Sequence, residues 1–279
     1  MHAPILAKKS QERDAVAIRM GSDQDSIPMT LATDTRKLYQ QVASTIMGSI
    51  MSGKYKPGER LPSERDLAVA FKVSRPTIRE AMIALEIRGL AETRHGSGIY
   101  VTDQPTAPTN SADLDIGAFE LTEARRLFEG EAAALAATQV SEECIEELER
   151  IIAEMEDENA RGQQDWTADR RFHIAIARAT RNTAIATVIE NLLDMRHKSP
   201  LCVYMLERAR RVGVQPRVSE HRRILVALRK RDPRAARNAM RGHLARVIED
   251  VLEATGPEAL GSTARTTKKP HDYIRRLAI

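Results

Sequence analysis

An aspartate and three histidines in the C-terminal half of the sequence have the residue types and spacing to hold a metal ion. Asp169 and His173 stand four positions apart in a helical pattern, which puts both side chains on one helix face. His221 and His243 fall in two later helical patterns. Facing helices of a bundle can direct side chains at one interior point, and one carboxylate with three imidazoles suits Zn, Ni or another divalent first-row ion. A lone helical histidine is more commonly a surface or core residue, so spacing alone leaves both interpretations open.

A second group of polar side chains, in the N-terminal half, has the types needed to contact DNA. Arg75 and Arg79 follow Ser74 at the start of a predicted helix, with Thr77 between them. Long guanidinium donors near a helix N-terminus suit the major groove, and the short hydroxyls of Ser74 and Thr77 suit phosphate oxygens. Any one of these arginines could equally be a solvated helix charge.

Three more residues extend this group. Arg65, on the preceding predicted helix, is expected to point toward the same phosphate backbone. His95 and Gly96 begin a glycine-rich hairpin tip, which is expected to enter the minor groove because a tip with few side chains avoids collision there.

The elements around the arginines follow the order helix, helix, turn, helix and hairpin, which is that of a winged helix-turn-helix. Ser63 is expected to cap a helix that runs through Phe71, with Leu67 and Ala70 facing inward, and Ser74 a helix that runs to 88. Strand-like runs at 90–93 and 99–101 flank the glycines. The apolar stripe expected for the first helix is Leu38, Val42, Ile46 and Ile50.

The rest of the chain shows helical periodicity throughout. The sequence predicts six helices, at about 119–140, 142–161, 166–180, 183–211, 218–230 and 233–254. Consecutive helices joined by short loops favour an antiparallel bundle. We therefore expect a mostly α protein with a winged helix-turn-helix and an all-α bundle.

Shifts in composition divide the chain. Residues 103–117 are rich in Pro, Thr, Asn and Ser, which is typical of a linker. The expected segments are a disordered arm at 1–34, a DNA-binding domain at 35–102, this linker, a helical domain that carries the candidate metal site at 118–255, and a C-terminal tail at 256–279.

Composition excludes several classes of protein. The 279 residues carry a net charge of +4, with 42% hydrophobic and only 4% aromatic residues, which favours helix over sheet. No apolar stretch approaches the length of a membrane-spanning helix, and the N-terminal residues lack the apolar region of a secretory signal. The two cysteines, Cys144 and Cys202, cannot form a disulfide scaffold or a zinc ribbon, so we expect a cytoplasmic protein.

An enzyme is the alternative for the Asp/His group, because a metal with open positions can be catalytic. The sequence has no HExxH, no GxSxG and no phosphate-cradling glycine loop, and the glycines near 96 lack the strand-to-helix context of a dinucleotide site. We therefore expect no enzyme. A metal sensor stays open and would respond to metal alone.

Four runs across the first domain resemble the GntR family of bacterial transcription regulators: PGERLPSERDLA at 57–68, VSRPTIREA at 73–81, LEIRGL at 85–90 and HGSGIYV at 95–101. The resemblance implies that Arg65, Arg75 and Arg79 contact operator DNA and that Gly96 reaches the minor groove.

The helical region resembles the effector domain of the FadR-type branch of that family, the FCD domain. The resemblance rests on RRLFE at 125–129, the Asp-x3-His pair, Asn182, His221 and His243. It implies that Asp169, His173, His221 and His243 hold a divalent metal, whose open positions take a carboxylate of the effector. Arg125 is expected to help bind that acid, with Arg126 as the rival. Glu129, Asn182 and Arg196 are the further effector-site candidates, and a plain surface position is the alternative for Arg196.

The runs GAFELTEAR at 117–125, RKLYQQ at 36–41 and MRHKSP at 195–200 are similar to regulators of hexuronate catabolism, the UxuR/ExuR type. The similarity implies a sugar acid as effector, with lactate, pyruvate or another small acid as alternatives. Family members are usually homodimers, so we expect a palindromic operator and a repressor whose affinity for that operator the acid controls.

Overall fold

The computed structural model describes residues 37–103, 116–162, 166–257 and 259. The arm expected at 1–34, residues 104–115 of the expected linker, and residues 258 and 260–279 of the expected tail lie outside the described residues. The described part is mostly helical, as expected from the composition.

The N-terminal part is a winged helix-turn-helix. Its elements are α1 (Leu38–Met51), α2 (Glu64–Phe71), α3 (Arg75–Ile87), β1 (Ala91–Arg94) and β2 (Gly98–Val101). The hydroxyl of Ser63 accepts a hydrogen bond from the backbone of Asp66, and that of Ser74 from the backbone of Thr77, so both predicted caps are present. β1 and β2 pair antiparallel as the wing, each one residue away from its expected start.

The core of the first helix differs from the expected stripe at one end. Val42, Ile46 and Ile50 are buried, but Leu38 is 53% exposed and Tyr39 takes the inner position. Four-residue steps exceed the 3.6-residue period of the helix, so a stripe with this spacing gradually rotates around the helix. Leu38, at one end of the stripe, therefore lies outside the buried face.

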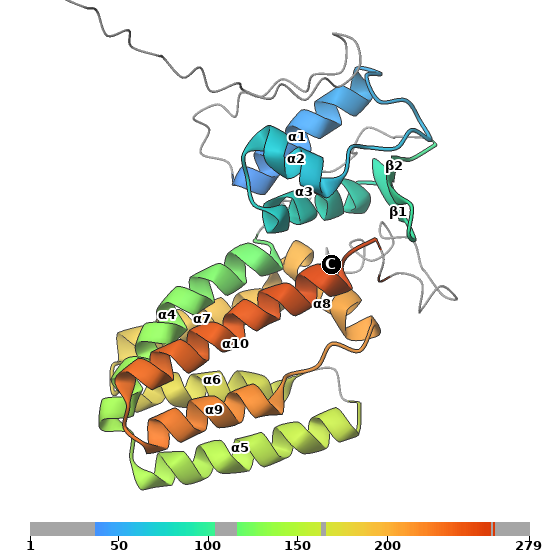
Figure 1. Cartoon of the computed structure of the whole chain (residues 1–279). Helices are drawn as coiled ribbons and strands as arrows, with labels where there is room; N and C mark the ends of the chain where they lie inside the picture. The colour runs from blue at the N-terminus through green and yellow to red at the C-terminus, as the bar shows by residue number, and fades with distance from the viewer. Residues whose placement is uncertain (1–36, 104–115, 163–165, 258, 260–279) are drawn as a thin grey trace, which may run out of the picture.

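The C-terminal part is a helical bundle in which α4 (Ala118–Gln139) runs beside α10 (Pro233–Ala254) (Figure 1). Around this pair lie α5 (Glu142–Ala160), α6 (Thr167–Ala179), α7 (Thr183–Lys198), α8 (Pro200–Arg211) and α9 (Val218–Arg229). None of the helices in the described ranges is long and apolar enough to cross a lipid bilayer.

The single helix expected at 183–211 was wrong, because the chain forms two helices that meet at Ser199. Ser199 has extended backbone angles, φ −77° and ψ 120°, and its hydroxyl accepts from the backbone of Cys202. Pro200 follows at the first position of α8, and a proline disfavours helical backbone in the residue before it. The break turns α8 toward the N-terminal part, where it packs against α3.

Candidate metal centre and nucleic-acid interface

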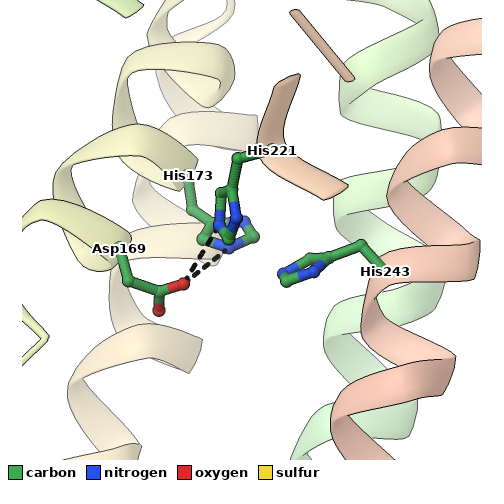
Figure 2. Close-up of side chains that lie close together, drawn as sticks. All are labelled: Asp169, His173, His221 and His243. Atoms are coloured by element: carbon green, nitrogen blue, oxygen red, sulfur yellow. Dashed lines mark hydrogen bonds and ion pairs between the residues drawn. The ribbon is translucent and has the colours of Figure 1, made fainter. Parts of the chain in front are cut away.

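The Asp/His group expected from the sequence comes together inside the bundle (Figure 2). Asp169 and His173 lie on α6, His221 on α9 and His243 on α10, and each is buried. Each of the four offers one ligand atom, and these atoms all lie within 4.8 Å of one another.

In each histidine, Nδ1 faces an acceptor outside the cluster. Nδ1 of His221 lies 3.0 Å from the backbone oxygen of Arg217. Nδ1 of His243 lies 3.0 Å from Oε2 of Glu220. Nδ1 of His173 makes an ion-pair contact with Oε2 of Glu129. The hydrogen-bonded outer acceptors of His221 and His243 are of the kind that fixes the tautomer and orientation of metal-binding histidines and leaves Nε2 for the metal.

The inner nitrogens converge on Asp169. Its Oδ1 lies 3.2 Å from Nε2 of His221 and 3.7 Å from Nε2 of His173. Nε2 of His173 is buried and makes no hydrogen bond to any described residue. A buried donor set of one oxygen and three nitrogens with an unsatisfied nitrogen fits a divalent transition metal ion.

The electrostatics keep two of these ligands in their metal-binding forms. Burial would raise the pKa of Asp169, but the neighbouring imidazoles of His173 and His221 and the positive charge of Arg196 hold that pKa well below its usual range. Burial lowers the pKa of His243 to about 4, so its imidazole is neutral at pH 7. An ionised carboxylate and a neutral imidazole are the forms that bind metal.

Two arginines border the cluster. Nε of Arg125 donates to Oε1 of Glu129 at 2.6 Å, and both residues are buried. Nη2 of Arg125 is buried without a hydrogen-bond partner among the described residues. The rival Arg126 is exposed on the same helix. Arg196 is also buried, and its Nη1 donates to Oδ2 of Asp169 at 2.9 Å, so the surface alternative for Arg196 was wrong.

A small cavity of about 30 Å³ opens beside the cluster, among Arg125, Asp169, Arg196, His243 and residues 214–217 of the α8–α9 loop. This is far below the roughly 300 Å³ at which ligand pockets begin. The last effector-site candidate, Asn182, does not join the group. Its exposed side chain caps α7 and accepts from the backbone N–H groups of Ala184 and Ile185.

Sequence reasoning missed Glu220 and Trp166. Glu220 is buried and orients His243 from the neighbouring helix. Trp166 is buried beside the guanidinium of Arg196, whose Cζ lies 5.4 Å from the ring centroid. The position of Glu220 next to His221 in sequence was a signal, but its contact with His243 depends on the packing of α9 on α10.

Most of the candidate DNA contacts lie at the surface. Arg65, Ser74, Arg75, His95 and Gly96 are exposed, and Thr77 is half-buried. Gly96 has φ +61°, in the left-handed region that favours glycine, so the wing tip can turn there without strain.

Arg79, which was expected to contact operator DNA, is not exposed in this structure. It is only 4% exposed, pairs with Glu64 of α2, and donates from Nη1 to the backbone oxygen of Leu252 of α10 at 3.0 Å. Arg79 therefore lies between the two domains in this arrangement and cannot contact DNA in it.

Comparison with known proteins matches each part of the chain to a family. Residues 38–101 match the bacterial regulatory proteins of the gntR family, and residues 120–246 match the FCD domain.

Two curated relatives extend the similarity over most of the chain. The Exu regulon transcriptional regulator of Escherichia coli is 40% identical over 220 residues, which cover 76% of this chain and 83% of the relative. The Uxu operon transcriptional regulator of Escherichia coli is 38% identical over 240 residues, which cover 81% of this chain and 91% of the relative. Among solved structures, Streptococcus agalactiae GntR aligns with 27% identity and a TM-score of 0.40, over 76% of this chain and 99% of that one.

Proposed function

Because this chain belongs to the GntR family of bacterial transcription regulators and carries an FCD domain, we propose that a small carboxylic acid, bound beside a divalent metal ion in the helical domain, controls its DNA binding. The chain is a DNA-binding transcription regulator. Its relatives are regulators and not enzymes, so the enzyme alternative is set aside.

The observation that carries the metal proposal is the orientation of the histidines. All three direct Nδ1 at an outer oxygen, while Nε2 of His173 and His221 faces Asp169. We assign the metal to Asp169, His173, His221 and His243, with Zn or Ni as the ions that suit these donors. When bound, the ion would supply positive charge and open positions for an effector carboxylate.

Arg125 is the first candidate to bind the acid, because its buried Nη2 has no hydrogen-bond partner within the described ranges. A guanidinium can hold a carboxylate through two parallel hydrogen bonds. Arg196 is the second candidate, since it borders the same cavity and already touches Asp169. The cavity must widen to admit an acid larger than a water molecule.

A hexuronate or a related sugar acid is our first choice of effector. This choice rests on the resemblance to regulators of hexuronate catabolism and on relatives named for the Exu regulon and the Uxu operon. Lactate, pyruvate or another small acid is the alternative, and a pure metal sensor is the third.

We further propose a homodimer that acts in the cytoplasm as a repressor on a palindromic operator. Leu127 and Phe128, adjacent on α4, are 63% and 51% exposed and form an apolar surface suited to a second copy.

The test is a thermal-shift panel on metal-loaded protein with hexuronates, lactate, pyruvate and dicarboxylates. A ligand that binds only the folded state stabilises it by about 2.7 kcal/mol at 100 times Kd. A shift with one acid that is lost in Asp169→Ala would support the effector site. No shift with any acid, together with DNA binding that changes with metal alone, would favour the metal sensor.

A further inference from the structure

The face of the N-terminal domain that carries the candidate DNA contacts, the DNA-contact face, lies opposite the helical domain, with most of its side chains exposed to water in the space between them. A cleft of about 1340 Å³ separates the two. Arg65, Arg75, Arg79, His95 and Gly96 lie on one wall, and the α8–α9 loop and the end of α10 form the other.

Two hydrogen bonds hold the walls together. Nη1 of Arg79 donates to the backbone oxygen of Leu252 at 3.0 Å. The backbone N–H of Gly96, at the wing tip, donates to the oxygen of Pro257 at 3.3 Å.

The wall opposite the arginines carries three acidic residues and one arginine, Arg217. Glu249, Asp250 and Glu253, all from the last two turns of α10, line the cleft. These carboxylates line the same cleft as the guanidinium groups of Arg65 and Arg75. The end of α10 therefore presents to the DNA-contact face the same sign of charge as a DNA backbone.

A DNA duplex cannot dock on this face while the helical domain lies opposite it. A recognition helix must enter a major groove about 12 Å wide, with a phosphate backbone on each side. Here α3 is buried continuously from Ile78 to Ile87, and of its residues only Arg75 and Arg79 border the cleft.

One loop forms a wall of both the cleft and the small cavity beside the Asp/His cluster. Residues 214–217, between α8 and α9, line each of them. The loop is attached to α10 by Arg217, whose Nη2 and Nε donate to the two carboxylate oxygens of Asp250 at 2.6 and 2.9 Å. A ligand that widens the 30 Å³ cavity on the side of this loop therefore moves a wall of the cleft as well.

We propose that this arrangement is a self-inhibited state, in which the end of α10 and the α8–α9 loop cover the DNA-contact face, and that filling the cavity releases the cover. The covering itself needs only the geometry above, whereas the release by a ligand rests on the proposed function. DNA and the end of α10 then compete for the same face, and the measured affinity for DNA is reduced by the fraction of molecules that are open.

Two variants weaken the closed state at different places. Asp250→Asn removes the partner of Arg217 and one acidic group of the cleft wall. Gly117→Ala acts without a change in charge: an added Cβ would lie 2.0 Å from Oε1 of Glu80, so that side chain must shift from its contact with the start of α4. We expect this shift to weaken the attachment of α3 to the helical domain.

Each variant has a matched control. Glu149→Gln removes an exposed carboxylate that pairs with Arg229, on α5 and away from the cleft. Gly48→Ala adds a methyl group on α1, where nothing lies within 4 Å of the new atom.

The measurement is the affinity of the full chain, without added metal or acid, for a duplex selected by this protein from a random library. We expect Asp250→Asn and Gly117→Ala to bind about 5- to 10-fold more tightly than the wild type, and both controls to bind like the wild type. Equal or weaker binding by both cleft variants would overturn the inference. Because metal and acid are absent, this result is independent of the thermal-shift test of the effector.

Hydrogen exchange on the wild-type protein gives a second test that needs no variant. If DNA displaces the cover, adding the duplex should speed amide exchange in 212–217 and 247–257 while it slows exchange in α3. Protection of α3 with no faster exchange in those two segments would contradict the proposal.

Discussion

Oε1 of Glu80, on α3, accepts a hydrogen bond from the backbone N–H of Phe119, in the first turn of α4, at 2.9 Å. The next N–H, that of Glu120, donates to the same oxygen at 3.3 Å. A side chain of the predicted recognition helix thus caps the first helix of the effector domain, the helix that also carries Arg125. A movement of α4 therefore acts directly on the recognition helix.

This contact makes the stability of the protein depend on pH in a defined direction. Burial raises the pKa of Glu80 to about 8, although the two backbone N–H groups lower it in part. Between about pH 4.5 and pH 8, Glu80 is therefore protonated in the folded protein and ionised in the unfolded chain. The contribution of Glu80 is complete at the acidic end of that range and is lost as pH rises through about 8.

We predict that the free energy of unfolding of the wild type, relative to Glu80→Gln, falls by up to about 1.4 kcal/mol per pH unit across this range. Urea unfolding of both proteins at pH 5.5, 7 and 8.5 measures it, and groups that both proteins share cancel in the difference. Glu149→Gln, an exposed change on α5, is the control. A difference that does not vary with pH would contradict a protonated Glu80.

The second prediction concerns base contact by the recognition helix. Arg75 is exposed at the first position of α3, so Arg75→Ala should weaken binding to the selected duplex by about 1–3 kcal/mol if it contacts a guanine. Relaxed preference at one base pair should accompany the loss. Arg150→Ala, an exposed arginine of α5, is the control. Unchanged affinity in Arg75→Ala would remove that residue from the DNA contacts.

Local signals were sufficient for most of the fold. The caps at Ser63 and Ser74 and the start of α10 at Asp232 each depend on a few neighbouring residues, and all three are present. The break at Ser199 carried the same kind of signal as Asp232, a capping residue followed by proline. Helical periodicity continues on both sides of Ser199, and this periodicity predicted one helix there instead of two.

Sites that depend on distant packing were predicted less completely. The pairing of Asp169 with His173 follows from helical spacing, whereas the contact of Glu220 with His243 needs two helices to be docked. The burial of Arg79 depends on the docking of two domains, which no local pattern encodes. Asn182 matched a family position but serves as a cap here, because asparagine suits that role equally well.

The third prediction tests the metal. The double change His173→Ala with His221→Ala removes two of the four assigned ligands. Elemental analysis of the purified double variant should therefore find no bound metal. Glu220→Gln, which disturbs only the outer partner of His243, should weaken metal affinity by about 10- to 100-fold. His197→Ala, exposed on α7, should keep the wild-type content. A full equivalent of metal in the double variant would refute the assignment.

The fourth prediction tests the homodimer. Leu127 and Phe128 present apolar side chains to solvent on α4, so replacing both with Glu should give a monomer in sedimentation at a concentration where the wild type is a dimer. Val226→Glu, on α9, is the control because Val226 is also an exposed apolar residue, at 46%. A double variant that sediments as a dimer would move the interface to another face.

The fifth prediction separates effector binding from DNA binding by means of two adjacent arginines. Arg125 is buried beside the Asp/His cluster with one unsatisfied donor, whereas Arg126 is exposed on the same turn of α4. Arg125→Lys keeps a charge but cannot form the planar two-point contact with a carboxylate. The measurement is a titration of acid into the metal-loaded protein bound to its duplex, followed by the change in DNA binding. In Arg125→Lys, half of that change should require at least about tenfold more acid than in the wild type, equivalent to about 1.4 kcal/mol. Affinity for the duplex without acid should stay close to that of the wild type, and Arg126→Lys should respond like the wild type. Equal sensitivity of Arg125→Lys and the wild type would move the acid contact to Arg196, and a loss in Arg126→Lys alone would mean that the exposed residue binds the acid.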